Sequence, residues 1–155
     1  MTSSLFLVRH GQAMPESRDS LRPLSPQGVK ELEKLAKYIA AQNIQIDEVL
    51  HSNKLRARQT AEILSKHIGP SGGLREVGGL SPMDDPQPWI NELTVSNDKL
   101  MLVGHLPFMS RLASLLLTKR MNSSCIVFYP GTVAAFRNSG GDWAVEWVIP
   151  ASFTR

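Results

Sequence analysis

The sequence of 155 residues has a single cysteine, Cys125, and this scarcity excludes two kinds of site. One thiol cannot form an intrachain disulfide, and it cannot supply a cysteine-based zinc site. Cys125 lies in the apolar segment Cys-Ile-Val-Phe-Tyr, where we expect a buried, unreactive thiol. The four histidines are far apart and lack metal-ligand spacing, so we expect neither a metal site nor a cofactor.

Long apolar runs and basic clusters are also missing. No stretch approaches the roughly 20 apolar residues that span a bilayer, and the N-terminus does not resemble a signal peptide. The net charge of +3 is spread along the chain, whereas nucleic-acid binding needs a concentrated basic surface. We therefore expect a cytoplasmic protein with neither a membrane nor a nucleic acid as partner. The mild cationic excess suits an anionic substrate or an acidic protein surface.

Strand and helix patterns alternate along the chain, whose length suits one domain over residues 1–155. Apolar runs predict strands at 5–8, 46–50, 100–103, 126–129, 132–137 and 143–149. Helical periodicity predicts helices at 26–39, 53–67, 88–94 and 107–118, separated by long loops at 12–24 and 69–88. This order indicates the α/β class, a three-layer α/β/α sandwich. Its central sheet should be mostly parallel, with an antiparallel addition at the C-terminal end.

Charged and imidazole side chains follow three of the predicted strands. Arg9 and His10 end the first strand, Arg56 comes soon after the second, and His105 follows the strand at 100–103. Right-handed crossovers bring the carboxyl ends of these strands to one sheet edge. Guanidinium groups match phosphoryl oxygens in bidentate fashion, and nearby helix N-termini add N–H donors. The sequence therefore predicts an anion site at this edge.

Other histidines and the tryptophans are expected to be structural. His51 closes a strand, and His67 ends a helix where an imidazole can face the negative end of the dipole. Trp143 and Trp147 are expected to pack in the core. Trp89 is also expected to pack, although its place beside the 69–88 loop puts it near the predicted site.

Three segments together resemble the histidine phosphatase, or phosphoglycerate mutase-like, superfamily. They are Leu-Val-Arg-His-Gly at 7–11, Leu-His-Ser-Asn-Lys-Leu-Arg-Ala-Arg-Gln-Thr-Ala at 50–61 and Leu-Val-Gly-His-Leu-Pro at 102–107. The short chain, the segment Asp-Ser-Leu-Arg-Pro-Leu-Ser at 19–25 and the Gly-His-Leu-Pro ending resemble the small SixA-type phosphohistidine phosphatases. The resemblance implies a phosphoglycerate mutase-like fold and one histidine phosphatase domain. It also implies a metal-independent reaction through a covalent phosphohistidine.

The same resemblance assigns roles to individual residues. His10 would be the nucleophile, while Arg9, Arg56 and His105 would hold and polarise the phosphoryl group. Further contacts would come from the phosphate-binding positions Gly11, Arg22 and Leu106, and Ser52 would cap the following helix. The physical chemistry agrees, because an imidazole attacks only when neutral and flanking arginines lower its pKa.

One departure from the larger members of the superfamily concerns the general acid. They carry a glutamate in the loop after the third strand, whereas the comparable stretch here, residues 77–82, has no carboxylate. Asp19 is the better candidate for this role, and Glu76, Asp84 and Asp85 are weaker ones. Because a nitrogen leaving group needs less protonation than an alkoxide, this gap favours a phosphoramidate or an activated phosphate as substrate.

Several functions are compatible with these residues. The first is a phosphatase for phosphohistidine on a histidine-containing phosphotransfer protein. The second is a small-molecule phosphatase for sugar phosphates or nucleotides. A short chain without large insertions favours the first, because it leaves the site open to a protein-borne phosphoryl group. A mutase ranks lower because it needs a more enclosed site. A non-catalytic phosphate-binding adaptor ranks lower because every expected catalytic position is filled.

Overall fold

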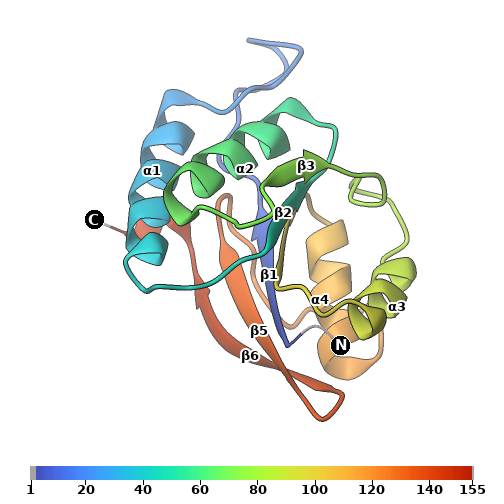
Figure 1. The fold of residues 1–155 in the computed structure, drawn as a ribbon. Coiled ribbons are helices and arrows are strands. Elements are labelled where there is room, and N and C mark those ends of the chain that lie inside the picture. The colour runs from blue at the N-terminus through green and yellow to red at the C-terminus, as the bar shows by residue number, and fades with distance from the viewer. Residues whose placement is uncertain (1–2, 155) are drawn as a thin grey trace.

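The computed structural model describes residues 3–154, and its strands form a single six-stranded mixed sheet (Figure 1). The strand order is β3-β2-β4-β1-β5-β6. The strands are β1 (Ser4–Arg9), β2 (Glu48–His51), β3 (Leu74–Glu76), β4 (Leu100–Gly104), β5 (Val133–Ser139) and β6 (Asp142–Ile149). The helices are α1 (Pro26–Ala40), α2 (Leu55–Ile68), α3 (Gln87–Val95) and α4 (Phe108–Thr118), followed by a 3-10 turn at Ala151–Phe153.

The sheet direction agrees with the expectation from the sequence. Strands β3, β2, β4 and β1 run parallel, whereas β5 pairs antiparallel with β1 and β6 antiparallel with β5. Two details differ. The short strand β3 lies within the stretch expected to be a loop, and residues 126–129, expected to form a strand, are irregular. The predicted three-layer sandwich and its antiparallel addition are confirmed.

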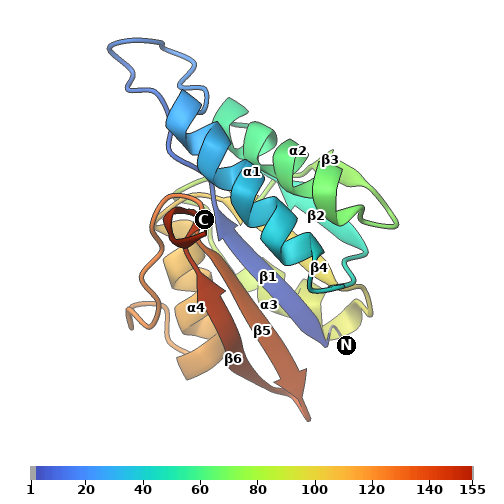
Figure 2. The same ribbon diagram turned by 90° about the vertical axis from the view of Figure 1, so that its left-hand side faces the viewer.

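Helices cover both faces of the sheet (Figure 2). Successive residues of β1 point to opposite faces, as in any strand. Phe6 and Val8 pack in the cluster under α1 and α2, while Leu5 and Leu7 pack in the cluster under α4 and α3. Burial on both sides explains why this strand is a continuous apolar run. The two clusters hold the strand ends of the parallel region in place.

Helix α1 begins where the sequence indicates. The Ser25 Oγ accepts a hydrogen bond from the Gly28 backbone N–H at 3.0 Å, and Pro26 occupies the first helical position. Leu32, Leu35, Ala36 and Ile39 are buried. Val29 of the same helix is 38% exposed and lies at the margin of the buried face.

The carboxyl ends of β1, β4 and β2 lie at one level. Arg9 is paired with Gly104 across β1 and β4, and His51 with Val103 across β2 and β4. Two backbone hydrogen bonds continue this pairing past the strand ends. The His10 N–H donates to the Gly104 carbonyl at 2.9 Å, and the Ser52 N–H donates to the Val103 carbonyl at 3.2 Å. The residues that follow the three strands are therefore neighbours.

The expectation for Cys125 was wrong, because this residue is exposed. It lies in the irregular segment before β5, which packs few of its side chains against the sheet. Among residues 3–154, no helix combines the length and the apolar character needed to cross a membrane.

Candidate active site

His10 lies at the end of β1 and is only 8% exposed. Its Nδ1 lies 2.8 Å from the Gly11 carbonyl oxygen. A carbonyl only accepts hydrogen bonds, so Nδ1 carries the proton and Nε2 presents a lone pair. The Arg56 Nε lies 3.3 Å from that Nε2 and donates to it. The structure thus presents the Nε2 of His10 as a nucleophile beside a guanidinium group.

Burial and positive charge keep His10 neutral. Loss of hydration on burial is the largest cause that lowers the pKa of His10, and the cations Arg56, Arg9 and Arg22 also lower it, whereas the Gly11 hydrogen bond raises it. Together these effects bring the pKa of His10 from its ordinary value of 6.5 to about 4. A neutral imidazole is the form that attacks phosphorus. The environment therefore favours the reactive protonation state near pH 7.

His105 follows β4 and faces His10 across the site. The two ring centroids are 5.1 Å apart, and His105 is 2% exposed. Burial and the nearby charges of His10, Arg56, Lys54 and Arg22 lower the pKa of His105 to about 3. Its Nδ1 is buried and has no hydrogen-bond partner among the described residues. A buried donor or acceptor without a partner is costly, and a bound anion relieves that cost where the buried nitrogen carries a proton.

Three arginines gather around the histidines. Arg9 donates from Nη1 to the Phe128 carbonyl at 2.8 Å, whereas its buried Nε has no partner among residues 3–154. Arg22 donates from Nε to the Met14 carbonyl at 3.2 Å and has a left-handed backbone, with φ 48°. That conformation is uncommon for a residue with a side chain. The positive charge of Arg22 lowers the pKa of both His10 and His105.

Gly11 orients the site rather than offering a free amide. Its N–H donates to the Thr60 Oγ1 at 3.0 Å, and that hydroxyl donates to the Arg56 carbonyl at 2.7 Å. A Cβ at Gly11 would lie 2.5 Å from the Leu32 Cδ1, so any other residue here would force the buried Leu32 side chain to shift. The phosphate-binding role of Gly11 stays a prediction, and its N–H donates to the Thr60 hydroxyl in this structure.

Thr60 was not expected from the sequence, and it joins the first strand end to helix α2. Thr60 follows Arg56 by four residues, so both lie on one face of α2. This spacing is the sequence signal that could have placed Thr60 beside the site. The Phe128 carbonyl was also missed. It lies in a segment 119 residues along the chain from Arg9, beyond the reach of any local pattern.

The carboxylates proposed as general acids take part in turns. The Asp19 Oδ1 accepts a hydrogen bond from the Leu21 N–H at 3.0 Å. Asp84 likewise accepts from the Ser81 N–H of its own loop, and Asp85 accepts from the Gln87 N–H at the start of α3. Glu76 is exposed on β3. The charged groups that shift the pKa of His10 are arginines, and Asp19 is not among them. A role for Asp19 as the general acid stays a prediction.

Leu106 follows His105 directly and is half-buried against the cluster of α3 and α4. Its assignment to phosphate binding stays a prediction. No three His, Cys, Asp or Glu side chains lie close enough together to hold a metal ion in the part of the chain that the structure describes.

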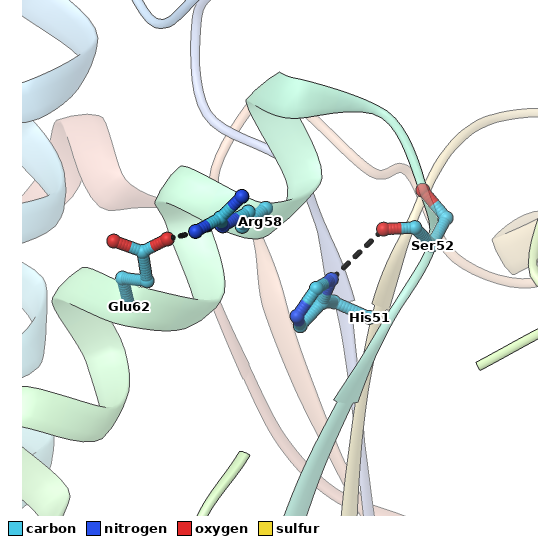
Figure 3. A network of polar contacts seen from close by, with 4 residues as sticks. All are labelled: His51, Ser52, Arg58 and Glu62. Atoms are coloured by element: carbon cyan, nitrogen blue, oxygen red, sulfur yellow. Dashed lines mark hydrogen bonds and ion pairs between the residues drawn. The ribbon is translucent and has the colours of Figure 1, made fainter. Parts of the chain in front are cut away.

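The residues expected to be structural have structural partners. The His51 Nδ1 donates to the Ser52 carbonyl at 2.8 Å (Figure 3). The same figure shows the Arg58–Glu62 ion pair of α2. His67 pairs with Glu33 of α1 at 2.6 Å, so its partner is a carboxylate rather than the helix end alone. Trp89 is buried and donates to the Gly79 carbonyl at 2.7 Å.

Comparison with known proteins identifies the family. A model of the histidine phosphatase superfamily (branch 1) matches residues 5–81. The phosphohistidine phosphatase SixA of Escherichia coli K12 is 30% identical over 118 residues, covering 71% of each chain. The chain belongs to the histidine phosphatase superfamily.

Solved structures agree with this histidine phosphatase fold. The structure of SixA with tungstate has a TM-score of 0.83 at 24% identity, covering 96% of this chain and 97% of that one. An Escherichia coli protein described as a putative alpha-ribazole-5'-P phosphatase has a TM-score of 0.77 at 15% identity, covering 97% and 98%. The expected phosphoglycerate mutase-like fold and the SixA-type branch are confirmed. This relationship supports phosphatase activity of the histidine type.

Proposed function

We propose that this chain hydrolyses phosphohistidine on a phosphotransfer protein through a phosphorylated His10. The observation that carries the proposal is the state of His10: its Nδ1 is bonded to the Gly11 carbonyl, so Nε2 is unprotonated and lies 3.3 Å from the Arg56 guanidinium. Two buried nitrogen atoms that have no hydrogen-bond partner among residues 3–154, the Arg9 Nε and the His105 Nδ1, belong to the same site. They match the oxygens of a phosphoryl group.

The reaction has two displacements. In the first, the lone pair of the His10 Nε2 attacks phosphorus and the bond from phosphorus to the substrate nitrogen breaks. The leaving imidazole takes up one proton from solvent, and the attacking water of the second step returns one proton to solvent. In the second, water attacks the phosphorylated His10, which releases phosphate and restores the neutral ring. Arg9, Arg22 and Arg56 supply fixed positive charge to the oxygens in both steps, so the proposal needs no metal.

Exposed apolar side chains beside the site support a protein substrate. Val127 and Tyr129, which are 68% and 55% exposed, flank the residue whose carbonyl binds Arg9. Leu21 is 69% exposed and adjoins Arg22. Apolar and aromatic side chains around a cationic centre are typical of protein-binding surfaces, whereas a free sugar phosphate offers them little to contact. The SixA relative is itself described as a phosphohistidine phosphatase.

A comparison of substrates tests the proposal. The protein would be assayed in chelator with a phosphohistidine-bearing phosphotransfer domain, p-nitrophenyl phosphate, a sugar phosphate and a nucleotide. We expect the phosphoprotein to have the highest kcat/KM, and His10→Ala to abolish turnover. Acid-labile label on the wild type but not on His10→Ala would support the covalent step. Preference for a sugar phosphate or nucleotide would contradict the substrate class, and full activity of folded His10→Ala would contradict the mechanism.

A further inference from the structure

The Ser52 hydroxyl lies at the end of β2 and makes the shortest side-chain contact of the site. Ser52 is 1% exposed, and its Oγ lies 2.6 Å from the Nε2 of His105. The backbone N–H of Lys54 donates to the same oxygen at 3.3 Å. The expectation that Ser52 caps the following helix was wrong, because the N-cap of α2 is Lys54 and it has no side-chain cap hydrogen bond. The contact with Lys54 lies in the turn before the helix, and it leaves the shorter contact with His105 to be explained.

A count of protons assigns the direction of this hydrogen bond. A neutral imidazole carries one N–H, on either Nδ1 or Nε2. The Ser52 oxygen already accepts from Lys54, and its own proton needs an acceptor; the lone pair of the His105 Nε2 supplies one. The single N–H of His105 then lies on Nδ1, the buried atom without a partner among residues 3–154.

The backbone around Ser52 is held on both sides. Its N–H donates to the Val103 carbonyl at 3.2 Å, and its carbonyl accepts from the His51 Nδ1 at 2.8 Å (Figure 3). The hydroxyl is therefore presented to His105 from a fixed position. His51 is not one of the reacting groups, but its buried ring holds the backbone of Ser52 in place.

We propose that Ser52 is a positioning residue that holds His105 in the Nδ1–H tautomer, so that Nδ1 donates to a phosphoryl oxygen. This inference rests on the proposed function for its ligand, a phosphoryl group. The opposite tautomer would place a lone pair where the anion binds and would repel it. A neutral His105 has a single ring proton, and this proton has to be on Nδ1 for the ring to donate to the anion. The hydrogen bond from the Ser52 hydroxyl to Nε2 selects that tautomer.

Nitrogen NMR of the full chain with labelled histidines reads the tautomer directly. We expect the His105 Nδ1 to be the protonated nitrogen in wild type, and its signal to shift when inorganic orthovanadate binds. In Ser52→Ala we expect the protonated fraction of Nδ1 to fall and vanadate to bind about tenfold more weakly. Loss of a group that orients a ligand typically costs about 10- to 100-fold, so kcat/KM for p-nitrophenyl phosphate should fall by that factor.

Two variants separate positioning from packing. Ser52→Thr keeps the hydroxyl and should restore the tautomer and most of the vanadate affinity. Ser65→Ala removes a buried hydroxyl of α2 without a partner in the described part of the chain, and it should change neither. A protonated Nε2 of His105 in the wild type would overturn the proposal even if no variant folds. An unchanged tautomer in folded Ser52→Ala would do the same.

The tautomer and vanadate measurements do not depend on the physiological substrate. If they come out as expected while no phosphohistidine protein is hydrolysed, the proposed function fails and the role of Ser52 stands. If phosphohistidine hydrolysis is observed but the Nδ1 of His105 is unprotonated, the role of Ser52 fails alone.

Discussion

Replacing His10 with asparagine should make the fold less sensitive to acid. The side-chain amide of the His10→Asn variant can still donate to the Gly11 carbonyl, as the His10 Nδ1 does at 2.8 Å, but it does not titrate. In the wild type, the pKa of His10 is about 4 because the ring is buried beside arginines, against 6.5 in a model peptide. Between these values the unfolded chain binds the proton and the folded one does not. Acid therefore favours unfolding.

The size of the effect follows from linkage. The free energy of unfolding rises with pH wherever the unfolded state binds more protons, so stability is lost as the pH falls from about 6.5 to about 4. With these two pKa values, His10 alone accounts for a loss of about 2 kcal/mol between pH 7 and pH 5. Below about 4 both states are protonated and the loss stops growing.

Urea unfolding at pH 7 and pH 5 measures this difference. Groups that do not interact with His10 contribute equally to the wild type and to His10→Asn. The difference between the two pH changes therefore measures His10 together with its effect on His105. Leu35→Ala is the control, because it removes buried apolar volume at a typical cost of about 2–5 kcal/mol without removing a titrating group. It should keep the wild-type pH change. The same pH change in His10→Asn as in wild type would refute the argument.

Four further substitutions test other contacts of the site. Arg56→Met removes the guanidinium at the His10 Nε2 and should lower kcat/KM for p-nitrophenyl phosphate by about 100- to 1000-fold, measured by initial rates. Thr60→Val leaves the Gly11 N–H buried without its acceptor and should cost about 1–3 kcal/mol in urea unfolding, with Thr60→Ser close to wild type. Gly11→Ala places a Cβ 2.5 Å from the Leu32 side chain and should cost about 1–3 kcal/mol in the same assay. Asp19→Asn should slow hydrolysis of alkyl phosphates more than of aryl phosphates; equal slowing would mean that Asp19 only shapes its turn.

The local sequence pattern was sufficient to predict an element where the apolar residues of that element alone determine which of its faces are buried. The apolar run at 5–8 indicated the strand β1, and the helical periodicity of residues 26–39 indicated α1. The order of these elements then predicted that Arg9, His10 and His105 follow neighbouring parallel strands, because crossovers in such sheets have one hand.

Where the sequence pattern predicted strands incorrectly, the availability of a neighbouring strand for backbone hydrogen bonds determined the outcome. The run at 126–129 is apolar enough for a strand, but both edges of β1 are taken by β4 and β5, and Cys125 beside the run is exposed. The short β3 has three exposed residues and no apolar signal, yet it is a strand because the free edge of β2 offers it backbone hydrogen bonds.

The sequence alone determined which residues meet at the sheet edge, since strand order and charge are written along the chain. Only the tertiary structure decided their protonation states. Burial sets the pKa of His10, and the hydroxyl of Ser52 faces His105 from 53 residues away. Such effects depend on which atoms lie within about 3 Å, and distances between remote segments exist only after the chain has folded.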